Sequence, residues 1–355
     1  MPPLNPPKGG RIQSLDLARG FTVFIMPAAH TLMMYGQPIV HQTLLADIFR
    51  FLAEGPGAQL FMLLMGVSFS FSKRITKRYV FHRVLLLLTA AYLLNFFKFV
   101  VPLGLGILPE NLVAEFQLTS DLEALNFFLS MGDILHFAAI AYLILFLISR
   151  LKHYAFWSFL LAIAIMILSP YIWDVKTHIV FVDQLILLFN GHPPQTFFPV
   201  FPWLVYPLMG LTLGYLLKHN NPDYLLRKAG ITGLALIIIS LVFPPTKTIT
   251  DWPSFYRTEP ADTLFHLGFI LVWLCVIHWI TRKVKWNYFF SLLNFCSKHI
   301  TSIYIIQWIV ICWCMAFTGY IELDMITTAA WMCGVTVITL LLTYAITKSH
   351  VKKCI

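Results

Sequence analysis

The chain has 355 residues, of which 59% are hydrophobic and only 12% are charged. Ordinary soluble domains are about 45–50% apolar and about 25% charged, so this composition excludes a soluble globular protein and indicates a polytopic membrane protein. The net charge of +9 does not indicate nucleic-acid binding, because the cations lie in short clusters between apolar runs and form no basic surface domain.

Ten apolar segments predict an all-α fold of about ten transmembrane helices. They cover residues 16–35, 56–71, 84–105, 131–148, 155–173, 197–217, 229–243, 263–280, 300–318 and 325–346. We expect the whole chain, 1–355, to form a single domain with a flexible tail at residues 1–10. The apolar run after this tail lacks a small-residue cleavage site, so we expect the first helix to remain in the mature protein.

Two segments are expected to depart from a regular span. The sixth carries Pro199, Pro202 and Pro207, and because prolines free backbone carbonyls, we expect a broken helix there. The apolar stretch 179–189 is too short to cross about 30 Å of hydrocarbon, so we expect it to lie in the interface or to dip back into the membrane. An amphipathic stretch leads into the ninth span.

The distribution of positive charge predicts that both termini are cytoplasmic. The strongest cluster follows the second segment and contains Lys73, Arg74, Lys77, Arg78, His82 and Arg83. Cytoplasmic loops carry an excess of lysine and arginine, so this cluster marks the inner side. All but six of the 25 lysines and arginines fall on the predicted inner side or its boundary, and the exceptions are Arg50, Lys98, Lys176, Lys247, Arg257 and Lys298.

The six cysteines lie in the last quarter of the chain, mostly within apolar runs. Cys312 and Cys314 are two residues apart, which on a helix points them to different faces. We therefore expect neither a disulfide framework nor a zinc site, and no metal cofactor.

The first apolar segment combines a charged entrance with a titratable side chain deep inside it. Arg11, Asp16 and Arg19 precede the apolar run, and His30 follows Arg19 by eleven residues. At about 1.5 Å of rise per residue, His30 lies roughly 16 Å deeper than Arg19. An ionisable residue within a membrane helix is costly unless it serves a function, so His30 is a candidate site residue. The alternative is a packing histidine bonded to a neighbouring carbonyl.

Five different short motifs occur along the chain, each of them once. The first is R-x-x-x-L-D-x-x-R-G at 11–20, with His30 ten positions after its glycine. The others are FMLLMGVS at 61–68, GDILH at 132–136, PWLVYPLMGLTLG at 202–214 and SIYIIQ at 302–307. In this order they resemble the transmembrane acyltransferases of the heparan-alpha-glucosaminide N-acetyltransferase type, including their bacterial relatives, and the broader acyltransferase-3 group.

The chain departs from this resemblance at two places. Gln307 stands where relatives often have a histidine. The sugar N-acetyltransferase branch tends to place its catalytic histidine in the first outer loop and an asparagine at the position of His30. Aligned on Met26, that loop histidine falls on His41, so the resemblance leaves both His30 and His41 as candidate bases.

The resemblance implies an acyl-CoA donor, expected to be acetyl-CoA, whose phosphates need a cationic cradle. Arg19 is the first candidate, because it lies inside the opening motif. Asp16 is assigned to the substrate-binding residues, with an i, i+3 pair that only holds Arg19 as the alternative. The other candidate cations follow the second segment and are Lys73, Arg74, Arg78 and Arg83. Positive-inside charge or contact with anionic lipids explains this second group equally well.

Acyl transfer also needs a base for the acceptor and a surface that binds it. A histidine titrates near 6.5 and suits the role of base, which favours His30 or His41. Asp133 is a candidate to orient that base, and His136 and Trp203 are candidates to bind the acceptor. Helix capping by Asp133 and an interfacial aromatic belt containing Trp203 are the alternatives.

The sequence therefore predicts a multi-pass enzyme of the bacterial inner membrane. It would move an acyl group, expected to be acetyl, from cytosolic acyl-CoA to a sugar or glycan acceptor on the extracytoplasmic side. Expected partners are acyl-CoA, that acceptor and membrane lipids, with a homodimer left open and no nucleic acid. A transporter or lipid-handling protein is the alternative, since a broken sixth helix and intramembrane histidines suit it too.

Overall fold

The computed structural model describes residues 12–72, 75–118, 120–173, 175–177, 179–242 and 255–353. Within these ranges, nine helical stretches are long and apolar enough to cross a membrane, and α8 (Ile134–Ser149) is apolar but shorter. Together they correspond to the ten predicted segments, so the all-α, polytopic class is confirmed. The side on which each terminus lies stays a prediction.

By its internal contacts the chain divides into two compact units. The first comprises residues 1–57, 93–129 and 281–355, and the second comprises residues 58–92 and 130–280. Each unit is described by itself. Whether they act as the single domain expected from the sequence stays a prediction.

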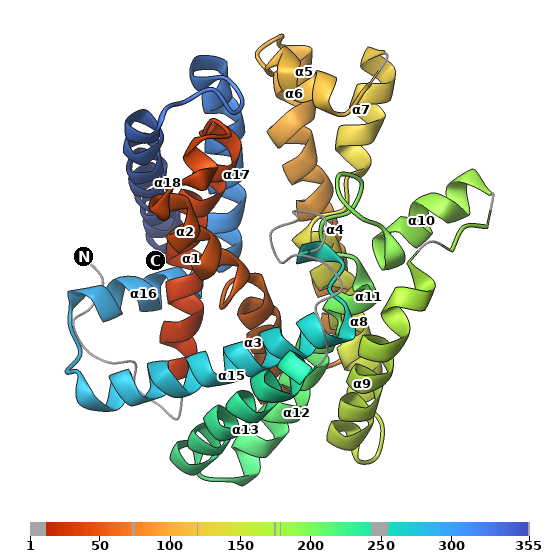
Figure 1. Ribbon diagram of the computed structural model, residues 1–355, viewed down its shortest axis with the longest axis vertical. Coiled ribbons are helices and arrows are strands. Elements are labelled where there is room, and N and C mark those ends of the chain that lie inside the picture. The colour runs from red at the N-terminus through yellow and green to blue at the C-terminus, as the bar shows by residue number, and fades with distance from the viewer. Residues whose placement is uncertain are drawn as a thin grey trace. The chain divides into compact units, whose positions relative to one another are not determined.

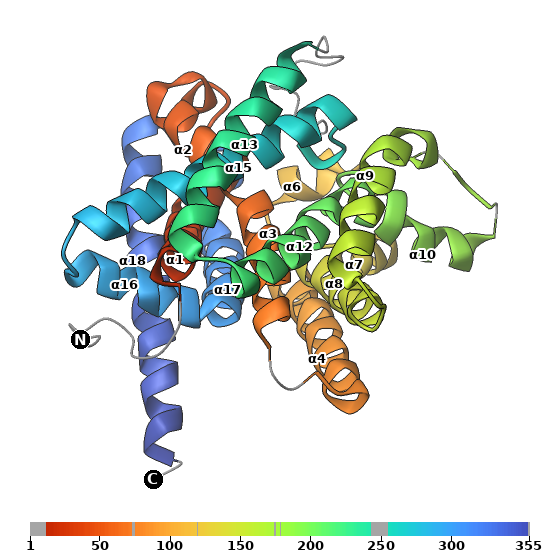
Figure 2. The ribbon, with the colours of Figure 1, turned by 90° about the horizontal axis from the view of Figure 1, so that it is seen from below.

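The first unit is built around α1 (Gln13–Tyr35), which packs against α2 (Leu44–Glu54), α16 (Tyr288–Lys298), α17 (Ile300–Thr318) and α18 (Met325–Lys353). Its smaller elements are η1 (Val40–Gln42), η2 (Phe96–Val100), α5 (Val101–Gly104), α6 (Glu110–Glu115) and α7 (Asp121–Ser130). Figure 1 shows α17 and α18 beside α1, and Figure 2 shows the C-terminal part of α18 extending beyond the other helices of this unit.

Two features fix α1 within its unit. A Cβ at Gly20 would collide with the carbonyl of Leu293, so the glycine of the opening motif lets α16 approach the backbone of α1 closely. At the other end of the helix, Gly36 and Leu323 form an isolated parallel bridge. Leu323 N donates to Tyr35 O at 2.8 Å and Gln37 N donates to Leu323 O at 2.9 Å. The end of the first helix is thereby bonded to the loop before the last one.

The second unit contains α3 (Ala58–Phe71), α4 (Lys77–Asn95), α8, α9 (Tyr154–Ile172), α10 (Val180–Asn190), α11 (Val200–Trp203), α12 (Val205–His219), α13 (Pro222–Val242) and α15 (Pro260–Lys283). Its core is α12, which packs against α3, α8, α9 and α13. The α3–α12 contact is close because glycines face backbone. A Cβ at Gly66 would collide with Pro207 O, and one at Gly210 with Leu63 O.

The structure confirms two local expectations and leaves a third as a prediction. The sixth segment is broken at Phe201, inside α11, where the backbone is non-helical (φ −102°, ψ 110°). The short stretch after the fifth span forms α10, a helix of 11 residues, and its place in the interface or within the membrane stays a prediction. The lead-in to the ninth span forms α16, and its N-cap is Asn287, whose side chain accepts from Phe290 N.

Candidate active site

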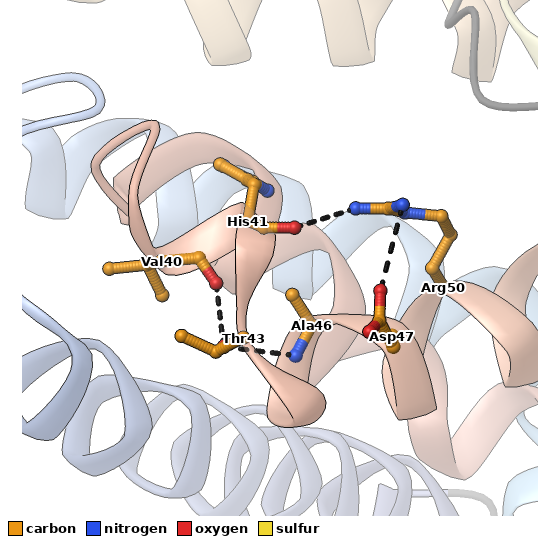
Figure 3. Close-up of polar contacts among 6 residues, drawn as sticks. All are labelled: Val40, His41, Thr43, Ala46, Asp47 and Arg50. Atoms are coloured by element: carbon orange, nitrogen blue, oxygen red, sulfur yellow. Dashed lines mark hydrogen bonds and ion pairs between the residues drawn. The ribbon is translucent and has the colours of Figure 1, made fainter.

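His41 lies in the short loop between α1 and α2, which η1 and a capping threonine shape (Figure 3). Its Nε2 lies 3.1 Å from the carbonyl oxygen of Gly36. Because a carbonyl only accepts, Nε2 carries the proton and Nδ1 of the neutral ring keeps its lone pair. Arg50 Nη2 donates to the carbonyl of His41 at 2.8 Å and pairs with Asp47 at 3.7 Å. Both the ring and the backbone of His41 are thus held.

The surroundings of His41 keep its ring neutral. Burial lowers the pKa of His41 from its ordinary value, and the positive charge of Arg50 lowers it further, while the hydrogen bond to Gly36 acts in the opposite direction. A histidine with an ordinary pKa near 6.5 is already mostly neutral at pH 7, and a lower pKa makes it more so. His41 therefore presents a proton acceptor at neutral pH.

His30 lies on α1, six residues before Gly36, which corresponds to roughly 9 Å of helical rise. Its Nδ1 lies 3.1 Å from Nε2 of Gln307 on α17. Its ring also stacks on the ring of Trp308, with centroids 4.4 Å apart. An amide nitrogen only donates, so Nδ1 of His30 accepts and its Nε2 carries the proton. In this arrangement His30 offers a hydrogen-bond donor.

A buried cation completes the group around His30. Lys98 is 3% exposed and lies on η2, a π-helical turn within the third span. Its Nζ lies 4.7 Å from the ring centroid of Trp308 and 4.6 Å from that of Phe99. Single π-turns inside α-helices often mark functional sites. We call His30, Lys98, Gln307 and Trp308 the His30 cluster.

The opening motif forms an ion pair at the other end of α1. Arg19 Nη1 lies 3.6 Å from Asp16 Oδ1, and both side chains are mostly buried. The i, i+3 pair that is the alternative interpretation of Asp16 is therefore present, and the substrate-binding role of Asp16 stays a prediction. Arg78 and Arg83 are exposed on α4 in the second unit. Arg11, Lys73 and Arg74 lie outside the described residues.

Asp133 and His136 form a capping box at the start of α8. Asp133 Oδ1 accepts from Ile134 N at 2.6 Å, and Asp133 N donates to His136 Nδ1 at 3.1 Å. The preceding Gly132 is needed because a Cβ there would lie 2.8 Å from Thr196 Oγ1. These contacts give the GDILH motif a structural reason, and the catalytic and acceptor-binding roles of Asp133 and His136 stay predictions.

Trp203 is 1% exposed and lies in an aromatic cluster with Phe198, Tyr206, Phe255 and Tyr256. Its Nε1 donates to the carbonyl of Tyr256 at 2.9 Å. A sugar ring could stack on Trp203 only if this cluster opened. Its role in acceptor binding stays a prediction.

Sequence reasoning did not select Lys98 and Trp308 as site residues, and it treated Gln307 only as a departure from a pattern. A signal was present for Lys98, because it is a cation inside an apolar span that breaks the positive-inside distribution. Gln307 and Trp308 carry no such signal, since they reach His30 only through the packing of α17 on α1. Within the described residues, no group of three or more His, Cys, Asp or Glu side chains could hold a metal ion.

The chain has the helices of an integral-membrane protein. Its first unit also contains a polar site, in which His30 and His41 are hydrogen-bonded. The chain belongs to the heparan-alpha-glucosaminide N-acetyltransferase catalytic family, which matches residues 11–242. No curated protein and no solved structure shows a significant match to the chain. The family match supports a membrane acetyltransferase over a transporter.

Proposed function

We propose that the protein transfers an acetyl group from acetyl-CoA to an amine or hydroxyl of a sugar, with His41 as the general base. The observation that carries this proposal is the hydrogen bond from His41 Nε2 to the Gly36 carbonyl. It leaves Nδ1 as the atom that can accept a proton, and burial keeps that atom unprotonated at neutral pH.

The proposed step balances as follows. His41 Nδ1 takes a proton from the acceptor's amine or hydroxyl as the nitrogen or oxygen lone pair bonds to the thioester carbonyl carbon. The carbon–sulfur bond then breaks, the sulfur keeps its electron pair, and the proton is passed on to give the free thiol of CoA. The products are an acetylated sugar and CoA, with no further reactant.

The His30 cluster is proposed to stabilise the charge that develops on the thioester oxygen. His30 Nε2–H is a hydrogen-bond donor, and Lys98 brings a positive charge to within 4.7 Å of the centroid of the Trp308 ring on which His30 stacks. Donors and charges placed in advance in a low-dielectric site are a large source of catalysis in acyl transfer. His30 is therefore proposed as a second catalytic residue, with a role different from that of His41.

The donor's phosphates are proposed to meet cations at the Arg19 end of α1. The pair with Asp16 holds the guanidinium of Arg19 in place, and a planar guanidinium binds phosphate oxygens bidentately. Arg78 and Arg83 fit the same task in that both are exposed. Lys73 and Arg74, together with acceptor contacts by Asp133, His136 and Trp203, remain part of the proposal on the resemblance alone.

The finer setting is also a proposal. The positive-inside pattern supports a cytosolic donor, an extracytoplasmic acceptor and cytoplasmic termini. We propose the inner membrane of a bacterium as the location and the acyltransferase-3 group as a more distant relative. A homodimer stays open.

The test is transfer of radiolabelled acetyl groups by the purified protein in liposomes. Acetyl-[14C]CoA is supplied with glucosamine, which offers an amine and hydroxyls, or with N-acetylglucosamine, whose amine is blocked. We expect labelled sugar with glucosamine. An alkali-stable product indicates an amide and an alkali-labile one an ester. If neither sugar nor a mixed glycan pool is labelled, and CoA is not released, the proposal is wrong.

A further inference from the structure

A cavity of about 300 Å³ opens at one end of the second unit. The ends of α3, α8 and α12 and the start of α9 surround it, and its polar lining is Ser70, Ser72, Ser149, Arg150, Tyr154 and Lys218. Its volume is at the lower end of the range of small-molecule sites, about 300–1,000 Å³. The four elements all begin or end here.

Two cations line the cavity, and each donates to a backbone carbonyl. Lys218 Nζ donates to Ser70 O, and Arg150 Nη2 donates to Ile75 O at 2.9 Å. Among the described residues these bonds use one of three lysine donors and one of five arginine donors. The remaining donors are available for a ligand, and no described residue that lines the cavity is acidic.

One residue that lines the cavity, Ser70, carries a hydroxyl group without a hydrogen-bond partner among the described residues. Ser70 is 6% exposed, and its Oγ has no hydrogen-bond partner among the residues that the structure describes. Leaving a buried hydroxyl unpaired is unfavourable, so a ligand that accepted a hydrogen bond from Ser70 Oγ would be stabilising. Ser149 is different, since its Oγ already donates to Phe146 O at 2.7 Å.

We propose that this cavity binds a phosphate group, with Arg150 and Lys218 neutralising its charge and Ser70 Oγ donating to one of its oxygens. A tetrahedral oxyanion offers acceptors to all three groups at once, whereas a cation or an apolar ligand would meet two positive charges. The group can come from an anionic phospholipid at the membrane surface or from a soluble nucleotide-like ligand such as CoA. A phospholipid site goes beyond the proposed function, whereas a CoA site would be part of the donor binding that the proposed function requires.

The competing explanation is that Arg150 and Lys218 only cap helix C-termini, where cations are favourable. Ser70 separates the two explanations. Lys218 bonds to the backbone oxygen of Ser70, so Ser70→Ala removes the cavity hydroxyl and leaves the capping bond intact. A capping role predicts no effect of this change on ligand binding.

The first experiment measures the melting temperature of the purified protein against inorganic phosphate, with sodium chloride at matched ionic strength. We expect phosphate to stabilise the wild type. The apparent affinity should fall about tenfold in Ser70→Ala and at least tenfold in Arg150→Gln and in Lys218→Gln, because each change removes a charge-assisted hydrogen bond. Lys152→Gln is the matched control, since Lys152 is exposed two residues from Arg150 and does not line the cavity.

The second experiment identifies the source of the phosphate group. Native mass spectrometry compares retention of phosphatidylglycerol with retention of phosphatidylcholine, and a titration compares CoA with 3′-dephospho-CoA. Loss of phosphatidylglycerol retention in Lys218→Gln assigns a lipid, and loss of CoA binding in the same variant assigns a nucleotide. The site is refuted if phosphate does not stabilise the wild type, or if Ser70→Ala, Arg150→Gln and Lys218→Gln respond to phosphate as the Lys152→Gln control does. Refutation of the site leaves acetyl transfer untouched, because the label-transfer assay tests that proposal separately.

Discussion

The loop after α1 and the start of α8 each hold a histidine bonded to nearby backbone, and the two bonds run in opposite directions. His41 donates from Nε2 to a carbonyl, so its Nδ1 is left as a proton acceptor. His136 accepts at Nδ1 from the backbone N–H of Asp133, so its bond completes a helix cap. The residue type alone does not distinguish a base from a cap. The direction of the hydrogen bond between the ring and the backbone does.

The largest effect is expected when the proton acceptor, the imidazole of His41, is removed. We expect His41→Gln to lower the rate of acetyl transfer by about 10²- to 10⁴-fold, the usual contribution of a general base. The measurement is the initial rate of label transfer from acetyl-CoA, with melting temperature as a check on folding. His82→Gln, at an exposed position on α4, is the control and should transfer at the wild-type rate. Wild-type activity of His41→Gln would exclude it as the base and favour His30.

The pH dependence of kcat/KM tests the same atom without mutation. Burial disfavours the charged imidazolium, so the pKa of His41 is lowered and the base stays neutral down to a more acidic pH. We expect a flat profile above about pH 6.5 and a fall of about tenfold per pH unit on the acid side of the lowered pKa. An acid limb centred at or above pH 7 would contradict the assignment.

The cap on α8 predicts a smaller effect, on stability. Asp133→Ala should lower the free energy of unfolding by about 1 kcal/mol, because the side chain that accepts from the first turn is lost. Asp133→Asn should restore most of it, since asparagine caps as well as aspartate. Thermal unfolding in detergent measures both. A stable Asp133→Asn protein that no longer transfers acetyl groups would show that the carboxylate acts in the chemistry.

The smallest expected effect concerns Arg50, whose charge is the lesser of the two causes that lower the pKa of His41. Removing that charge in Arg50→Gln should move the acid limb to higher pH, because the lowering effect of Arg50 on the pKa of His41 is lost. Arg50→Lys keeps the charge and should leave the limb in place, although it loses the guanidinium bond to the His41 carbonyl. Equal limbs in the two variants would mean that charge is not the cause.

The fold was largely predictable because membrane spans and prolines act locally. Apolar length alone located the ten segments, Pro202 and its neighbours indicated the broken helix, and an i, i+3 spacing indicated the Asp16–Arg19 pair.

The candidate site was predictable only in part, because its remaining contacts join distant segments. Gln307 meets His30 across 277 positions, and Lys98 reaches Trp308 from another span. The hydrogen-bond directions that separate His41 from His136 depend on which backbone group lies beside each ring. Residue spacing does not encode that.

The bridge between Gly36 and Leu323 shows that the helices within the family match are held by residues outside it. The match stops at residue 242. However, the turn before His41 is hydrogen-bonded to residue 323, and residues 307 and 308 contact the ring of His30. A fragment that ends at residue 242 would lack the hydrogen bonds that hold the turn before His41. Residues 307, 308 and 323, which lie outside the matched range, thus support the first helix and the turn after it, which lie within that range.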